Sequence, residues 1–216
     1  AILISCSPFH GESIPLEYTE LAIRKAWQIF GQRNTFVYLS DWFEVMNSFG
    51  SQDPVPLEQY IQVFGQEEAG RMFWQGYGVI SGGRAGYRLA HLTPKGRPKS
   101  FQNESCAGEL LYAPHSHFDL YGNFIPAFCG GLRVGDWHDL PTLIADFAQG
   151  SYPELVRILI DSGPFGLYEM AREQFDYPAL KTGYTGKCHL CVDVRRHLVA
   201  QDLFPALQPR EFYENF

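Results

Sequence analysis

The spacing of apolar residues in the first forty positions alternates between strand and helix patterns. Residues 2–4 form a short apolar run that predicts a buried strand, and residues 16–30 repeat apolar side chains at helical spacing. Residues 35–39 predict the next strand. A strand, a helix and a strand within about forty residues are typical of a βαβ unit, so we expect the two strands to be parallel.

Turn-forming residues mark the ends of these elements. Gly31 is expected to end the first helix, and Ser40 or Asp41 is expected to be the N-cap of the helix after the second strand. Two short helices are predicted over residues 57–64 and 66–75. The glycine-rich segment 76–86 predicts a short buried strand followed by a flexible turn.

The pattern changes in residues 92–103, which are polar, contain two prolines and show no periodicity. We therefore place a boundary there and predict two domains, 1–98 and 99–216. The second domain is expected to begin with antiparallel strands, with a hairpin turn at residues 121–123. Its strands are predicted at 109–113, 117–120 and 124–128, its helices at 141–147, 153–161, 166–175 and 192–201, and a surface tail at 204–216.

Composition and charge narrow the function classes. The 216 residues carry a net charge of −7, which disfavours a nucleic-acid or anionic-membrane surface. No apolar run approaches the roughly 20 residues that span a bilayer, and no signal peptide is evident. Five cysteines suit a reducing cytosol better than a secreted disulfide scaffold, so a cytoplasmic protein is expected. The first residues already resemble the interior of a sheet, which predicts the C-terminal part of a longer protein.

Four of the cysteines form a candidate metal site. Cys188 and Cys191 form a Cys-x-x-Cys pair at a predicted helix start, Cys106 opens the second domain, and Cys129 precedes two glycines whose amides could approach a sulfur. Four thiolates complete either a zinc site or a cubane iron–sulfur cluster. The alternative is a metal-free α/β domain with structural cysteines.

Charged residues near these cysteines have two interpretations each. His115, His117 and Asp119 share one strand face, which could bind metal or substrate, or could simply be solvated. His189, Arg195 and Arg196 could offset cluster charge, or could form a solvated basic face with Asp193 as partner.

The end of the first predicted strand is a second candidate site. Ser5, Ser7, His10 and Glu12 lie where ligands bind in parallel α/β folds, so we expect them to contact a ligand. Cys6 alternates out of phase with the two serines and is expected in the core. The segment 82–86 could bind an anion through its amides or serve as a structural turn.

Residues 105–135 resemble the C-terminal region of radical S-adenosylmethionine proteins. The resemblance rests on Cys106, the strand pair His117-x-Asp-x-x-Gly-Asn-x-x-Pro126, and Cys129, a combination that in those proteins builds an auxiliary iron–sulfur site of the SPASM or twitch type. Residues 183–195 are similar to a closing segment of that family. Residues 4–12 resemble the end of a barrel strand that helps to hold adenosylmethionine.

The resemblance implies a fold, a cofactor and a function. The fold would be α/β, with strands of a partial (β/α) barrel in residues 1–98 and a small α+β module carrying the cysteine-ligated cluster in 99–216. One [4Fe–4S] cluster would serve electron relay or structural support, and S-adenosylmethionine would bind the full-length protein near Ser5, Ser7, His10 and Glu12. The implied partners are the missing N-terminal barrel portion and a peptide or protein substrate. The cluster ligands would be Cys106, Cys129, Cys188 and Cys191.

This sequence also departs from the family. The Cys-x3-Cys-x2-Cys motif that holds the radical-generating cluster is absent, so this chain alone cannot cleave adenosylmethionine, and no catalytic residue is assigned. Ala127 stands where many SPASM domains have a cysteine. The competing hypothesis is a non-enzymatic binding module stabilised by zinc on the same four cysteines, since sequence does not distinguish the metals.

Overall fold

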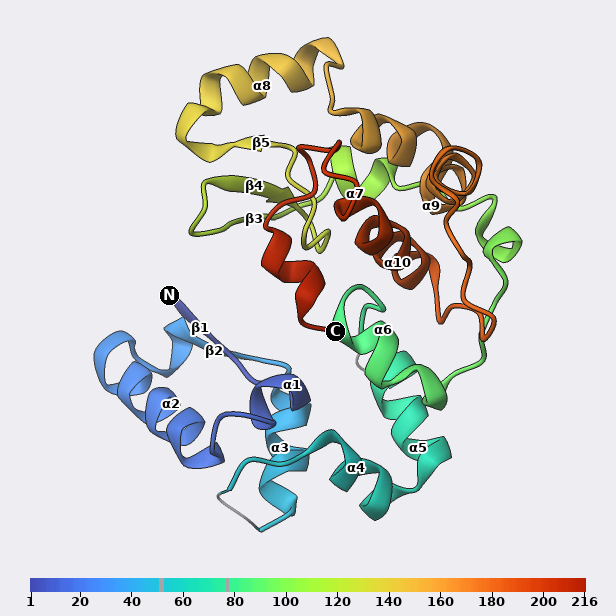
Figure 1. The fold of residues 1–216 in the computed structure, drawn as a ribbon. Coiled ribbons are helices and arrows are strands. Elements are labelled where there is room, and N and C mark those ends of the chain that lie inside the picture. Colours follow the sequence, from blue (N-terminus) through green and yellow to red (C-terminus); the bar gives the residue numbers. More distant parts are fainter. Residues whose placement is uncertain (51–52, 77) are drawn as a thin grey trace. The chain divides into compact units, whose positions relative to one another are not determined.

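The computed structural model describes residues 1–50, 53–76 and 78–216, which form two compact units, Ala1–Gly78 and Val79–Phe216 (Figure 1). Helices combine with small sheets in an α/β fold, which confirms the predicted class. Residues 79–98 pack within the second unit. Within the described residues, none of the helices combines the length and the apolar character needed to cross a bilayer.

The first unit is built on the predicted βαβ element. β1 pairs with β2 in parallel, with Ile2 opposite Thr35 and Ser5 opposite Tyr38. Gly31 adopts a φ of 78° at the end of the connecting helix, as expected of a C-terminal glycine. The elements are β1 (Ile2–Ser5), α1 (Pro8–Gly11), α2 (Leu16–Phe30), η1 (Gln32–Asn34), β2 (Thr35–Tyr38), α3 (Ser40–Ser48), α4 (Leu57–Phe64), α5 (Gln66–Arg71) and the π-helical η2 (Met72–Gly76).

The start of α3 differs from the prediction. The N-cap residue is Leu39, with a φ of 64°, and neither Ser40 nor Asp41 takes that position. Leu39 is the single residue between β2 and α3, and its left-handed backbone conformation leads directly into the helix. A leucine side chain has no hydrogen-bond acceptor, so this helix start has no side-chain cap. On the buried side of α3, the ring of Trp42 packs with the rings of Tyr60 and Phe73. The three rings form an aromatic core with centroid separations of 5.0–5.8 Å.

The strand predicted within residues 76–86 is wrong for the described residues. Residues 78–82 form neither a strand nor a helix, and Ile80 is 37% exposed; residue 77 lies outside the described chain. A strand needs a partner strand for its backbone N–H and C=O groups, and none of the described strands pairs with this segment. The glycine-rich turn instead leads into α6 (Arg84–Arg88) through Gly83.

The second unit joins a small antiparallel sheet to a group of helices. The sheet order is β3-β4-β5, and His117 lies opposite Ile125. This confirms the predicted hairpin. After α6 the elements are η3 (Ala90–Leu92), η4 (Pro98–Phe101), α7 (Ala107–Leu111), β3 (Ser116–Phe118), β4 (Asn123–Pro126), β5 (Gly135–Asp136), η5 (Trp137–Asp139), α8 (Leu140–Gln149), α9 (Glu154–Phe175), α10 (Lys187–Val199) and η6 (Arg210–Glu214).

One prediction for the helical part needs correction, and another is confirmed. Residues 109–113 do not form a strand, because the segment folds as α7 and buries Leu110 on one face. The two helices predicted over 153–161 and 166–175 are present as the two helical segments of α9, which meet at a kink where Gly163 has a non-helical φ of 64°. A Cβ at Gly163 would lie 1.9 Å from the carbonyl oxygen of Glu104, so this close approach requires glycine.

The C-terminal tail is part of the core rather than a surface segment, which corrects the prediction for 204–216. Ala206, Leu207 and Tyr213 are buried in the same cluster as α9 and α10. α10 contacts both α9 and η6 (Figure 1). It also begins at Lys187, earlier than expected, so that Cys188 and Cys191 lie in its N-terminal turns.

Candidate four-cysteine site

Three segments of the second unit bring the four cysteines into one region. Cys106 is the N-cap residue of α7, and Cys129 lies in the turn after β4. Two hydrogen bonds connect α10, which carries the other two cysteines, to both segments. Lys187 Nζ donates to the Ser105 carbonyl at 2.8 Å, and Arg195 Nη1 donates to the Gly130 carbonyl at 2.9 Å. Each bond therefore ends on the residue next to a cysteine.

The four thiols interact electrostatically with one another. Cys106 interacts with Cys191 and Cys129, and Cys129 interacts in turn with Cys191 and Cys188. Burial raises the pKa of Cys129 to about 12 and that of Cys188 to about 11, and it raises the pKa of Cys106 further. These three thiols are therefore protonated and uncharged at neutral pH unless a metal displaces their protons.

The donor set of the four cysteines fits a metal. Four thiolates are the ligand set of structural zinc and of the cubane cluster. In the part of the chain that the structure describes, no three His, Cys, Asp or Glu side chains are grouped closely enough to hold an ion. The fit to a metal therefore rests on the type of donor and on the region that the four cysteines share.

A buried cation lies at the same place. Arg195 is 2% exposed, and its Nη1 also donates to the Tyr213 hydroxyl at 3.0 Å. Burial by itself would lower the pKa of Arg195, but interactions with Tyr213, Cys191 and Cys129 outweigh burial and raise it. Its Nε is buried with no hydrogen-bond partner. Arg195 is therefore part of the cysteine region.

The interpretation of Arg195 as part of a solvated basic face with Asp193 is wrong. Asp193 accepts hydrogen bonds from Tyr87 at 2.8 Å and from Tyr177, and it is not paired with Arg195. Arg196 is exposed and lies over the Tyr87 ring. The polar side of α10 is thus held by tyrosine hydroxyls, which position the helix.

The sequence contained a signal for the placement of Arg195. Cys188, Cys191 and Arg195 are separated by three and four residues, so they project from one face of a helix. The signal was not decisive, because the same spacing suits an exposed face. Lys187 and its ion pair with Glu109, at 2.7 Å, were not anticipated.

His189 faces a different environment from its neighbouring cysteines. Its ring lies 4.7 Å from that of Tyr87, and its Nδ1 accepts a hydrogen bond from the Thr185 amide at 3.2 Å. Burial lowers its pKa to about 4, so the imidazole is neutral. These contacts give His189 a packing role in holding the start of α10.

Glycines around the site have packing roles. A Cβ at Gly82 would lie 3.7 Å from Cys188 Cβ, so the turn at residues 82–83 covers that cysteine. A Cβ at Gly130 or Gly131 would lie 2.6 Å or less from the ring of Phe212. The glycines after Cys129 are therefore required where the tail packs against the turn, a reason that the sequence did not indicate.

The predicted histidine face forms only in part. His115 and His117 are exposed, with ring centroids 5.4 Å apart, and the His115 ring lies 4.6 Å from that of Phe128. Asp119 instead turns into the hairpin, where it accepts hydrogen bonds from the amides of Tyr121 and Asn123, each at 2.9 Å. Its carboxylate shapes the turn.

Two of the four residues predicted at the end of β1 are in contact in the first unit. Ser7 is the N-cap of α1, and its Oγ lies 2.7 Å from His10 Nδ1. Glu12 ends the same short helix, and Ser5 is exposed at the end of the strand. The cavity beside Cys6 and His10 has a volume of about 10 Å³, enough for about one water molecule. Cys6 is buried, as predicted.

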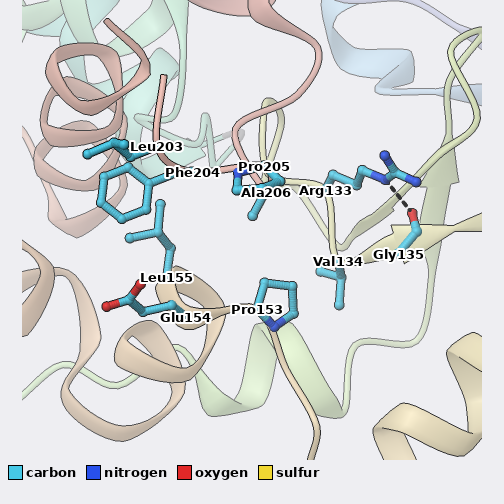
Figure 2. A pocket seen from close by; sticks show the side chains of 10 residues that line it. All are labelled: Arg133, Val134, Gly135, Pro153, Glu154, Leu155, Leu203, Phe204, Pro205 and Ala206. Carbon is cyan, nitrogen blue, oxygen red and sulfur yellow. Dashed lines mark hydrogen bonds between the residues drawn. The ribbon is translucent and has the colours of Figure 1, made fainter. Parts of the chain in front are cut away.

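Two larger cavities lie in the second unit, and no cysteine lines either of them. Figure 2 shows one of 320 Å³, where Arg133 donates to the Gly135 carbonyl at 3.2 Å beside an apolar wall of Leu155 and Phe204. The other, 460 Å³, is an apolar groove between α7, the β3–β4 hairpin and α8.

Comparisons with protein-family models, curated proteins and solved structures find no match for this chain. The resemblance to radical S-adenosylmethionine proteins therefore stays a prediction.

Proposed function

We propose that the chain is the C-terminal portion of a radical S-adenosylmethionine-type enzyme, and that its second unit binds one auxiliary [4Fe–4S] cluster through Cys106, Cys129, Cys188 and Cys191. One observation carries this proposal. Four cysteines from three distant segments share one buried region with a guanidinium that has no acidic partner among the described residues. A metal-free core of structural cysteines gives no reason for that charge.

The chain's own residues would hold and shield the cluster. When bound, such a cluster stores and passes single electrons. Four cysteine ligands leave no iron open to substrate, which favours electron relay or structural support. The bonds of Lys187 and Arg195 hold the three cysteine segments together, and the surrounding apolar core limits access of water.

The first unit would contribute to the adenosylmethionine and substrate pocket. The parallel pairing of β1 and β2 suits late strands of a (β/α) barrel, and Ser5, Ser7, His10 and Glu12 would line the pocket. The remaining strands and the radical-generating cluster would come from the N-terminal portion of the same protein. We propose a peptide or protein substrate by resemblance, and a cytoplasmic setting because all five cysteines are free.

Anaerobic reconstitution with iron and sulfide tests the proposal. We expect a brown protein with about four iron and four sulfide per chain. Changing Cys106, Cys129, Cys188 or Cys191 singly to serine should remove most of the visible absorption. Cys6→Ser is the matched control, since Cys6 is a buried cysteine of the other unit, and it should leave the absorption intact.

A zinc-stabilised binding module is the second candidate. The apolar groove of 460 Å³ favours it, since a module that binds a partner needs such a surface. A colourless protein with one zinc per chain, lost on mutation of the same four cysteines, would support this function and reject the cluster. A protein that takes up neither metal would reject both.

A further inference from the structure

The strongest unexplained feature of the described chain is the charge of Arg195. A buried cation is stable only when it is paired and its donors are satisfied. Arg195 donates to two neutral oxygen acceptors, the Gly130 carbonyl and the Tyr213 hydroxyl, and it is also hydrogen-bonded to the Cys191 side chain, while its Nε has no partner. The Tyr213 hydroxyl itself donates to the Gly131 carbonyl at 2.5 Å, so it accepts from Arg195 as a neutral phenol.

The other charges in this region are already balanced. Lys187 forms an ion pair with Glu109 at 2.7 Å, so each neutralises the other. The remaining groups that interact with Arg195 include Cys191 and Cys129. As protonated thiols these cysteines carry no charge, whereas as metal-bound thiolates they are anions that accept hydrogen bonds. Four thiolates around one divalent ion leave two negative charges uncompensated.

We infer that Arg195 is a built-in counter-cation of the four-thiolate site, with its Nε serving as a hydrogen-bond donor to a metal-bound cysteine sulfur. The inference rests on the proposed metal site and adds a residue that the ligand set does not include. Arg195 positions and neutralises the thiolates, and it is neither a metal ligand nor a catalytic residue. The positive charge of Arg195 would therefore favour metals whose complex with four thiolates carries a net negative charge.

Zinc binding to the full chain tests the role of Arg195 directly, because Zn²⁺ needs the same four thiolates and no sulfide. The variant Arg195→Met removes the charge and keeps much of the side-chain length. Arg196→Met is the matched control, since Arg196 is the exposed cation next to it on α10. Zn²⁺ affinity is measured by competition with a chromophoric chelator, and denaturant unfolding is measured for each metal-free protein.

We expect Arg195→Met to weaken Zn²⁺ binding about 10- to 100-fold, the range found for residues that support metal ligands. Arg196→Met should change the affinity less than about threefold. The metal-free Arg195→Met protein loses the bonds of Arg195 to Gly130 and Tyr213 together with an unpaired buried charge, so its stability is compared with that of the metal-free parent, and only a change in Zn²⁺ affinity is assigned to the metal site. Arg195→Lys, which keeps the charge and loses the planar donor group, should bind with intermediate affinity.

The outcomes separate this inference from the proposed function. If the parent chain binds neither Zn²⁺ nor an iron–sulfur cluster through the four cysteines, the metal site itself is rejected. If the parent binds Zn²⁺ and Arg195→Met binds it equally well, only the counter-cation role is rejected. If the metal-free Arg195→Met protein is less stable than the metal-free parent but binds Zn²⁺ with the same affinity, the role of Arg195 is in packing alone. If Arg195→Met does not fold, the Zn²⁺ affinity of Arg195→Lys is compared with that of Arg196→Met. A weaker affinity of Arg195→Lys supports the counter-cation role, and an equal affinity rejects it.

Discussion

The two units of this chain bury different kinds of side chain. The first unit has an aromatic core around Trp42, Tyr60 and Phe73, while its small sheet leaves Leu3 and Phe36 more than half exposed. The second unit has one continuous core that also encloses a guanidinium, tyrosine hydroxyls and cysteines. The first unit therefore leaves apolar strand residues exposed, and the second buries a charged side chain.

This difference predicts different sensitivities for the two units. An α/β layer with exposed apolar strand residues is stabilised by further strands or a covering layer. A core with an unpaired buried cation is stabilised by an anion. We expect changes in charge and metal to alter the stability of the second unit, and changes on the exposed sheet of the first unit to have small effects.

The largest expected effect is metal removal. If the second unit holds a metal, a chelator should lower its free energy of unfolding by several kcal/mol, because metal binding is coupled to folding. The first unit should be unaffected. Hydrogen exchange followed by mass spectrometry resolves the two units, and equal loss of protection in both would contradict this comparison.

Core truncation should give the next largest effect. Leu190 is fully buried on α10, and Leu190→Ala should cost about 2–5 kcal/mol. The matched change Leu57→Ala in α4 should act on the first unit instead. Hydrogen exchange after each change should show loss of protection in the unit that carries the mutation; loss in both units would show that they unfold together.

Asp119 should make the β3–β4 hairpin sensitive to acid. Partial burial by itself would raise the pKa of Asp119, but hydrogen bonds from Asn123 and Tyr121 outweigh it and lower the pKa. The folded pKa thus lies below the unfolded value of about 4, so the carboxylate stabilises the hairpin above that pH. This contribution is lost as the pH falls through the folded pKa.

Amide exchange at Asn123, followed by NMR between neutral pH and about pH 3, measures this loss relative to the random-coil rate. Asp119→Ala should destabilise the hairpin by about 1 kcal/mol at neutral pH and remove the acid-dependent change. If the acid-dependent change in amide exchange persists in Asp119→Ala, a titratable group other than Asp119 causes it.

The smallest effect is expected on the exposed sheet of the first unit. Phe36→Thr should change the free energy of unfolding of the chain by less than about 0.5 kcal/mol, since the ring is 55% exposed and threonine suits a strand. Denaturant unfolding monitored by circular dichroism gives the measurement. A loss of more than about 2 kcal/mol would mean that the ring is part of a core.

The sequence predicted elements whose signals are local. The helix at residues 16–30, the parallel strands around it and the hairpin at 121–123 follow from periodicity and turn residues, and each was found. The failures came from segments whose state depends on distant partners. Residues 78–82 lack a neighbouring strand, and the tail is buried because it fits against Gly130 and Gly131.

By itself the sequence determined which residues could carry the chemistry, since Cys188, Cys191 and Arg195 lie on one helical face whenever that segment is a helix. Only the tertiary structure decided that this face is buried and that it meets Cys106 and Cys129. The physical reason is that helical spacing is a short-range property of the backbone. Burial of a charge, in contrast, depends on contacts between segments far apart in the chain.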